Sequence, residues 1–171
     1  MSANNDGKAN ARQAPIRLRD CAPRQQKAFV MEVAALLVAG SATLEGGAIN
    51  ALRIPTTNFE LDQIPMWLTV PVIVVVHAPA GGDYDPEVFV VCKDPTGERR
   101  GAVRSIWHWP DEGKKPSKYR CFAHDFSFAI ESEGEYTIGV YSDADATNEI
   151  GTPIPVLVTL ATDRLVGTNG A

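Results

Sequence analysis

The sequence predicts an all-β fold: an antiparallel β-sandwich of about eight strands with a disordered basic N-terminal arm. Apolar runs recur roughly every ten to fifteen residues and turn-forming residues separate them, which is typical of a sandwich or barrel. Glycine (14 residues) and proline (12 residues) are frequent enough to end many short strands. Runs of β-branched residues, such as "PVIVVV" at 71–76, suit a pleated sheet and are disfavoured by crowding in a helix.

The charge of the chain divides it into an arm, a body and a tail. Residues 1–27 carry six Lys or Arg and two Asp, a net +4, so the rest of the chain carries −9 within the overall −5. This segment is poor in large apolar residues, which predicts that it is disordered when alone. We therefore expect a basic flexible arm (1–27), a β-sandwich domain (28–161) and a flexible polar tail (162–171).

The first two expected strands flank a glycine-rich stretch. The first covers Phe29 to Val38, where a helix is the alternative, although the nine residues of "MEVAALLVA" make a short one. The second covers Thr43 to Ile54 and contains the pair Gly46–Gly47. We expect this pair to form a hairpin bend, a bulge or a close backbone approach. A phosphate cradle is excluded because neither lysine nor hydroxyl follows the pair, and Glu45 would repel phosphate.

The six later strands alternate with loops built from Gly, Pro, Asp and Glu, which supply turn conformations. In "YTIGVY", Tyr136, Ile138 and Val140 share one face of a strand, and "FSFAI" alternates in the same way. The order of "DPTG" at 94–97 is that of a tight turn. The six strands are Trp67 to His77, Val88 to Cys92, Ala102 to Trp109, Tyr119 to Ile130, Tyr136 to Tyr141 and Ile154 to Leu160.

Two motifs resemble those of a bacterial family of domains of unknown function, whose members are single β-sandwiches. The stretch "LLVAGSATLEGGAINAL" is similar to the opening hairpin of that family. The stretch "EGEYTIGVYSD" is similar to its late strand, which leads to a closing strand, here "PIPVLVTL". The resemblance covers about Phe29 to Leu160 and implies the same sandwich fold. It carries over no catalytic residue.

The cysteines and apolar runs indicate a cytoplasmic protein without a membrane span. The three cysteines are odd in number and lack the spacing of a disulfide scaffold, so we expect reduced thiols; they are Cys21, Cys92 and Cys121. Residues 24–42 resemble a secretory signal peptide. However, Glu32 interrupts the apolar part of this segment, and a strand explains the apolar run better. The apolar run at 67–80 is too short to cross a bilayer.

Catalytic and metal motifs are incomplete, so we predict no catalytic residue, no metal site and no cofactor. Cys121 and His124 are close in sequence, but their odd spacing points them to opposite faces of a strand, which disfavours zinc. The acidic segment 143–149 fails the EF-hand template, and a looser calcium site at one end of the sandwich stays open. The histidines lack a distinctive serine or cysteine partner in the sequence.

The residues predicted to contact a partner are five cations of the arm and two tryptophans: Arg12, Arg17, Arg19, Arg24, Lys27, Trp107 and Trp109. The tryptophans share one face of an expected strand, with His108 on the other, and suit a protein-binding hot spot; packing in the core is the alternative. The opposite charges of arm and body favour self-association by arm exchange, which salt would weaken. Nucleic acid is disfavoured, because the acidic body repels phosphates.

Two functions follow from these expectations. The first is a non-catalytic structural or protein-interaction module, a subunit of a homo-oligomer or larger assembly whose basic arm contacts an acidic partner surface. The alternative is a small-ligand or carbohydrate-binding sandwich, or a cryptic hydrolase, that uses loops at one end. The loops 78–87, 109–118 and 142–153 would then meet over a concave pocket that contains His108 or His124.

Overall fold

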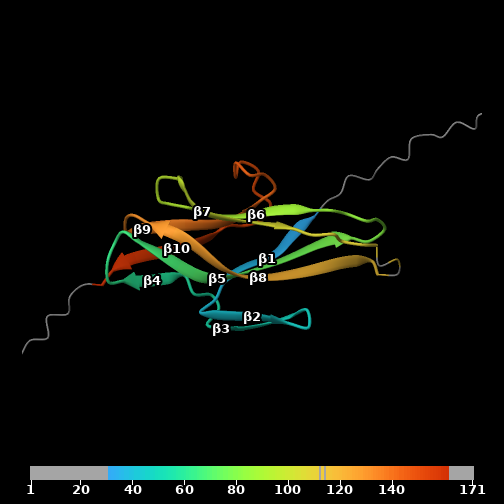
Figure 1. Ribbon diagram of the computed structural model, residues 1–171, viewed down its shortest axis with the longest axis horizontal. Helices are drawn as coiled ribbons and strands as arrows, with labels where there is room; N and C mark the ends of the chain where they lie inside the picture. Colours follow the sequence, from blue (N-terminus) through green and yellow to red (C-terminus); the bar gives the residue numbers. More distant parts are fainter. Residues whose placement is uncertain (1–30, 112, 114, 162–171) are drawn as a thin grey trace, which may run out of the picture.

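The computed structural model describes residues 31–111, 113 and 115–161, in which all the regular structure is β (Figure 1). The all-β prediction is therefore confirmed. The ten strands are β1 (Glu32–Val38), β2 (Ser41–Glu45), β3 (Ala48–Leu52), β4 (Asn58–Leu61), β5 (Met66–Pro79), β6 (Glu87–Lys93), β7 (Arg99–Ile106), β8 (Ser117–Ile130), β9 (Gly134–Tyr141) and β10 (Ile154–Leu160). No helix within the described ranges is long and apolar enough to span a membrane.

Two sheets pack face to face, and a hairpin lies outside one of them (Figure 1). The first sheet has three strands in the order β1-β5-β8, and the second has five in the order β4-β10-β9-β6-β7. All neighbouring strands are antiparallel except β4 and β10, which are parallel. The β2–β3 hairpin lies over the outer face of the three-stranded sheet. The predicted sandwich is thus present, with a small third layer.

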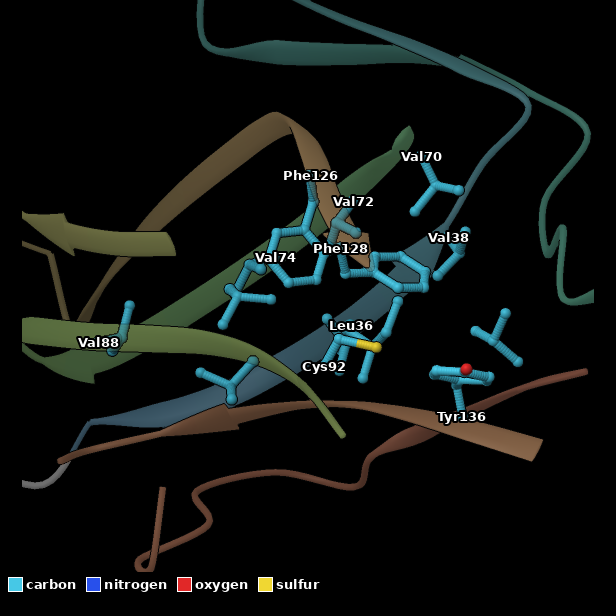
Figure 2. Close-up of a cluster of buried hydrophobic side chains, with 14 of the residues drawn as sticks. Leu36, Val38, Val70, Val72, Val74, Val88, Cys92, Phe126, Phe128 and Tyr136 are labelled. Atoms are coloured by element: carbon cyan, nitrogen blue, oxygen red, sulfur yellow. The ribbon is translucent and has the colours of Figure 1, made fainter. Parts of the chain in front are cut away.

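The core forms between the sheets because every second side chain of each strand points inward. Between positions 70 and 76 of β5, every inward residue is a valine, and each is at most 1% exposed. Phe126 and Phe128 of β8 extend the same layer, and Tyr136 of β9 meets them from the other sheet (Figure 2). Branched and aromatic side chains therefore fill the space between two pleated faces.

The order of the strands is that of an immunoglobulin-type sandwich. Strands β1-β5-β8 correspond to A-B-E, and β6-β9-β10 correspond to C-F-G. A tyrosine corner accompanies this order at the start of β9. The Tyr136 hydroxyl accepts a hydrogen bond from the amide of Glu131 (3.1 Å) and donates one to the carbonyl of Ser132 (3.1 Å). This ring is fully buried, so it fixes the β8–β9 connection to the core.

The first half of the chain differs from the predicted strands in two places. The expected strand from Thr43 to Ile54 is two strands, because Gly46 (φ 57°) and Gly47 (φ 81°) form a two-residue turn. The hairpin bend is confirmed, and a bulge at the pair is wrong. The alternative of a helix before Gly40 is also wrong, since 32–38 is strand β1. Strand β4 was not predicted; it is four residues long.

The other differences concern strand limits and the chain ends. The strand expected from Ala102 to Trp109 is β7, which begins earlier and ends at Ile106. The basic arm (1–27) and the tail (162–171) lie outside the described residues, as do the five predicted arm cations.

Candidate interaction surface

Exposed apolar side chains gather on the side of the three-stranded sheet that faces away from the core. Eight large apolar side chains of the described residues are exposed, and five of them belong to this face, to the β2–β3 hairpin or to the segment leaving it. These five are Leu44, Leu52, Ile54, Trp67 and Tyr119. Trp67 and Tyr119 lie at opposite ends of this face, so the candidate interaction surface is the end that carries Trp67, the largest of the five side chains.

Trp67 is the largest of these side chains, and 67% of it is exposed. It begins the outward row of β5, because its odd number places it opposite the buried valines. Its partner across β8 is the small Ala129, so nothing bulky covers the indole ring. A hollow of ≈ 340 Å³ surrounds it, here named the Trp67 hollow; it is lined by Pro65, Met66, Trp67, Ala129, Ile130 and Glu131. An aromatic ring in an open hollow can anchor a partner.

The end of the sandwich beside this hollow is acidic. We define the acidic end as residues 60–65, 93–100 and 131–135, which contain seven carboxylates and three cations. The carboxylates are Glu60, Asp62, Asp94, Glu98, Glu131, Glu133 and Glu135, and the cations are Lys93, Arg99 and Arg100.

One arginine of the acidic end forms ion pairs with three carboxylates. Arg100 contacts Asp94 (2.7 Å), Glu98 (2.9 Å) and Glu131 (2.8 Å). Hydrogen bonds from the Thr96 side chain and from Arg100 lower the pKa of Asp94 from 3.8 to about 2, so this carboxylate stays ionised. Since a single guanidinium cannot neutralise three carboxylates, this cluster, which includes Glu131 at the rim of the Trp67 hollow, keeps a net negative charge.

The predicted hot spot at Trp107 and Trp109 is wrong. The two rings do share a face, as predicted, but they are 6% and 3% exposed and belong to the core. Trp107 packs edge-on against Phe122 (centroids 4.9 Å apart), and Trp109 pairs with Tyr84 through the backbone. The alternating direction of side chains along a strand predicts that the two tryptophans share a face, but it does not determine whether that face points to the core or to solvent.

The loops 78–87 and 109–118 do meet, around a buried lysine. Lys118 is 2% exposed, and its ammonium donates hydrogen bonds to the carbonyls of Gly82 (2.5 Å), Pro110 (2.6 Å) and Trp109 (3.1 Å). Asp111 accepts backbone hydrogen bonds from residues 113 and 81, which lower its pKa. The two loops are therefore tied together by a side chain that fills the space between them.

The third loop, 142–153, lies elsewhere. Its carbonyls at 144 and 146 accept hydrogen bonds from Arg99 (2.8 Å) and Lys93 (3.0 Å), at the far end of β6 and β7 from the other two loops. Asp143 accepts hydrogen bonds from the amides of Thr147 (3.0 Å) and Asn148 (2.6 Å), which lower its pKa. The acidic loop considered as a calcium site is thus held by hydrogen bonds to one of its own carboxylates. The three loops do not converge on one pocket.

The histidines lie at separate positions. His124 points inward and contacts the Ser105 hydroxyl (Nε2–Oγ 3.2 Å), whereas His108 contacts Asp85 (2.8 Å) on the exposed end. Cys121 faces outward from β8, opposite to His124, as its spacing predicted. Within the part of the chain that the structure describes, no three His, Cys, Asp or Glu side chains converge as metal ligands.

Sequence reasoning missed Trp67 as a candidate. The run "WLTVPVIVVV" is apolar at almost every position, so alternation in polarity does not separate its two faces. The available signal was the odd position of Trp67 against the even valines, together with Thr69 in the same row. Thr69 and Ser127 are hydrogen-bonded across the strands (2.7 Å), which marks that row as solvent-facing.

Comparison with known proteins finds likeness only among solved structures. No protein-family model matches the chain, and no curated protein matches it. A β-glucosidase from Listeria innocua in complex with glucose is 12% identical, with a TM-score of 0.40 over 77% of this chain and 16% of that chain. A GH3 β-glucosidase from Bifidobacterium adolescentis is 15% identical, with a TM-score of 0.41 over 81% and 19%. The chain thus spans less than a fifth of each enzyme, and likeness at this level says nothing about its activity.

Proposed function

We propose that this chain is a non-catalytic interaction module that associates with copies of itself through the Trp67 hollow. The single observation that supports the proposal is the exposed indole of Trp67, set in a hollow on a sheet face while the other tryptophans are buried. Tryptophan is the residue most enriched at the energetic centres of protein interfaces. Its strand fixes the backbone, so docking has to order only the two side-chain torsions of the indole.

The size of the expected contribution can be worked from exposure. A tryptophan side chain buries about 150–250 Å² when covered, and 67% of Trp67 is exposed, so docking would bury roughly 100–170 Å². At about 25 cal/mol per Å² this gives about 2.5–4 kcal/mol before the costs of association. That range is typical of a hot-spot residue, and the neighbouring apolar lining adds to it.

A second candidate is the binding of a small polar ligand on the opposite face. A hollow of ≈ 610 Å³ there is lined in part by Lys93, Glu135, Thr137, Tyr141 and Glu149, which offer an ammonium, two carboxylates and two hydroxyls. The Lys93 ammonium lies 4.6 Å from the Tyr141 ring centre and is bonded to a backbone carbonyl, so part of this polar set is already engaged. Self-association therefore has the stronger support.

Sedimentation velocity of the full chain over a wide concentration range tests the proposal. We expect concentration-dependent association that Trp67→Ser weakens roughly 30-fold or more. Tyr119→Ser is the matched control, because Tyr119 is 65% exposed on the same face but at its other end. Unchanged monomer at every concentration, or equal effects of the two variants, would contradict the proposal.

A further inference from the structure

The Trp67 hollow combines an apolar floor with a negative rim, and this combination restricts what can occupy it. Five of its lining residues are apolar, and Glu131, with 54% of its side chain exposed, supplies the charge. The acidic end continues that charge with seven carboxylates against three cations. A fitting occupant therefore carries apolar side chains and cations close together.

The chain itself contains such a segment in its basic arm. In "PIRLRD", Ile16 and Leu18 alternate with Arg17 and Arg19. On an extended backbone, the two apolar side chains would face one way and the two guanidinium groups the other. The apolar row matches the floor of the hollow, and the long side chains of the two arginines match the carboxylates of the rim.

The path that the arm must take favours a second copy as its source. Strand β1 begins at Glu32, which pairs with His77, and Trp67 lies ten residues away along β5, roughly 33 Å. The twelve residue steps from Arg19 to Met31 span at most about 40–43 Å when fully extended, so a molecule's own arm is long enough to reach the hollow. Strand β1 runs toward the Trp67 end, however, so that arm would have to turn back at the start of β1 and pass the β2–β3 hairpin, which lies over the middle of this face (Figure 1). The arm of a second copy approaches without this turn and this obstacle.

We propose that residues 15–20 of the basic arm of one copy dock in the Trp67 hollow of a second copy. This inference rests on the proposed function and names its partner. The arm leaves one end of the sandwich and binds the opposite end of its neighbour, so the contact is head-to-tail. Such contacts close into a two-fold dimer when two copies exchange arms reciprocally, and otherwise they close into larger rings or continue as filaments. Because ionic pairs contribute, salt near 1 M, where the Debye length is about 3 Å, weakens the association.

Mixing two full-length variants tests the head-to-tail contact. The R17E/R19E variant loses a functional arm and keeps its hollow, whereas the W67S variant loses its hollow and keeps its arm. We expect the R17E/R19E substitution to weaken self-association roughly tenfold or more, and each variant alone to be monomeric where the parent associates. An equimolar mixture should then form a complex of two chains and no larger species, as measured by light scattering coupled to size exclusion.

Controls separate the failure of this inference from the failure of the proposed function. R17K/R19K keeps the charges and should weaken association less than R17E/R19E does, and W67K replaces W67S if the latter does not fold. Loss of association in W67S but not in R17E/R19E would overturn the inference and leave self-association at Trp67 intact. The absence of a complex in the mixture, with both variants folded by circular dichroism, would also overturn it. A parent that never associates would overturn both.

Discussion

The hydroxyl of Tyr136 offers the sharpest test of the fold, because its removal is a change of one atom. Tyr136→Phe keeps the buried ring, which packs against Phe128 (centroids 6.2 Å apart), and removes only the oxygen. That oxygen accepts hydrogen bonds from the amides of Glu131 (3.1 Å) and Ser132 (3.4 Å) and donates to the Ser132 carbonyl (3.1 Å). The substitution therefore leaves two donors and one acceptor without this partner.

The expected loss follows from these three contacts. A typical net hydrogen bond contributes about 0.5–1.5 kcal/mol, and a buried group left unsatisfied costs about 1–3 kcal/mol. The residues of this connection are themselves exposed, so water can replace part of the loss. We therefore expect the free energy of unfolding to fall by about 2 kcal/mol, near the middle of this range.

Urea denaturation followed by circular dichroism measures this change. With a urea m-value of about 2 kcal/mol per M, the midpoint should fall by about 1 M while the slope stays unchanged. Tyr119→Phe is the matched control, because its ring is 65% exposed, and it should change stability by less than about 0.5 kcal/mol. If both variants shift the midpoint equally, the tyrosine corner does not hold the β8–β9 connection.

Three further substitutions or reactions probe the packing and the charges. In Gly101→Ala the new Cβ would lie 2.7 Å from the Cβ of Phe128, so the two sheet edges must separate and thermal unfolding should show a loss of about 1–3 kcal/mol; a loss below about 0.5 kcal/mol contradicts this close approach. The folded pKa of Asp94 is about 2 against an ordinary 3.8, so its stabilisation is complete above pH 3.8 and is lost as the pH falls toward 2. The stability difference between the parent and Asp94→Asn should therefore shrink across that window in acid titrations, and a constant difference would contradict the ion network. Burial raises the pKa of Cys92 to about 12, so iodoacetamide at pH 8 should label Cys121 before Cys92 in the native protein, as read by peptide mass spectrometry; equal rates at these two positions contradict the burial of Cys92.

Much of the fold could be predicted because it depends on local chemistry. The β-branched run in β5 and the alternation in β9 each determine a strand through sterics that act within a few residues. The turn at Gly46–Gly47 follows from the positive φ that both positions need and that glycine adopts freely. These signals require no knowledge of the partner strand, so the sequence carries them directly.

The candidate site could not be predicted in the same way, because burial depends on long-range packing. Trp107 and Trp67 both lie in apolar runs, and which row of each run meets the other sheet is decided by pairing across the whole sandwich. Strand β4 is stabilised by its parallel pairing with β10, which lies about 100 residues further along the chain. Lys118 ends the loop 109–118, and no local pattern shows that three carbonyls from two loops surround its ammonium.

Hydroxyl-radical footprinting of the unmodified chain tests most directly whether Trp67 is the docking surface. Oxidation of Trp67 and Tyr119 should be comparably rapid in dilute protein, because both side chains are about two-thirds exposed. At concentrations where the chain associates, Trp67 should become protected while Tyr119 is oxidised as before. Association that leaves Trp67 as reactive as in dilute protein would contradict it.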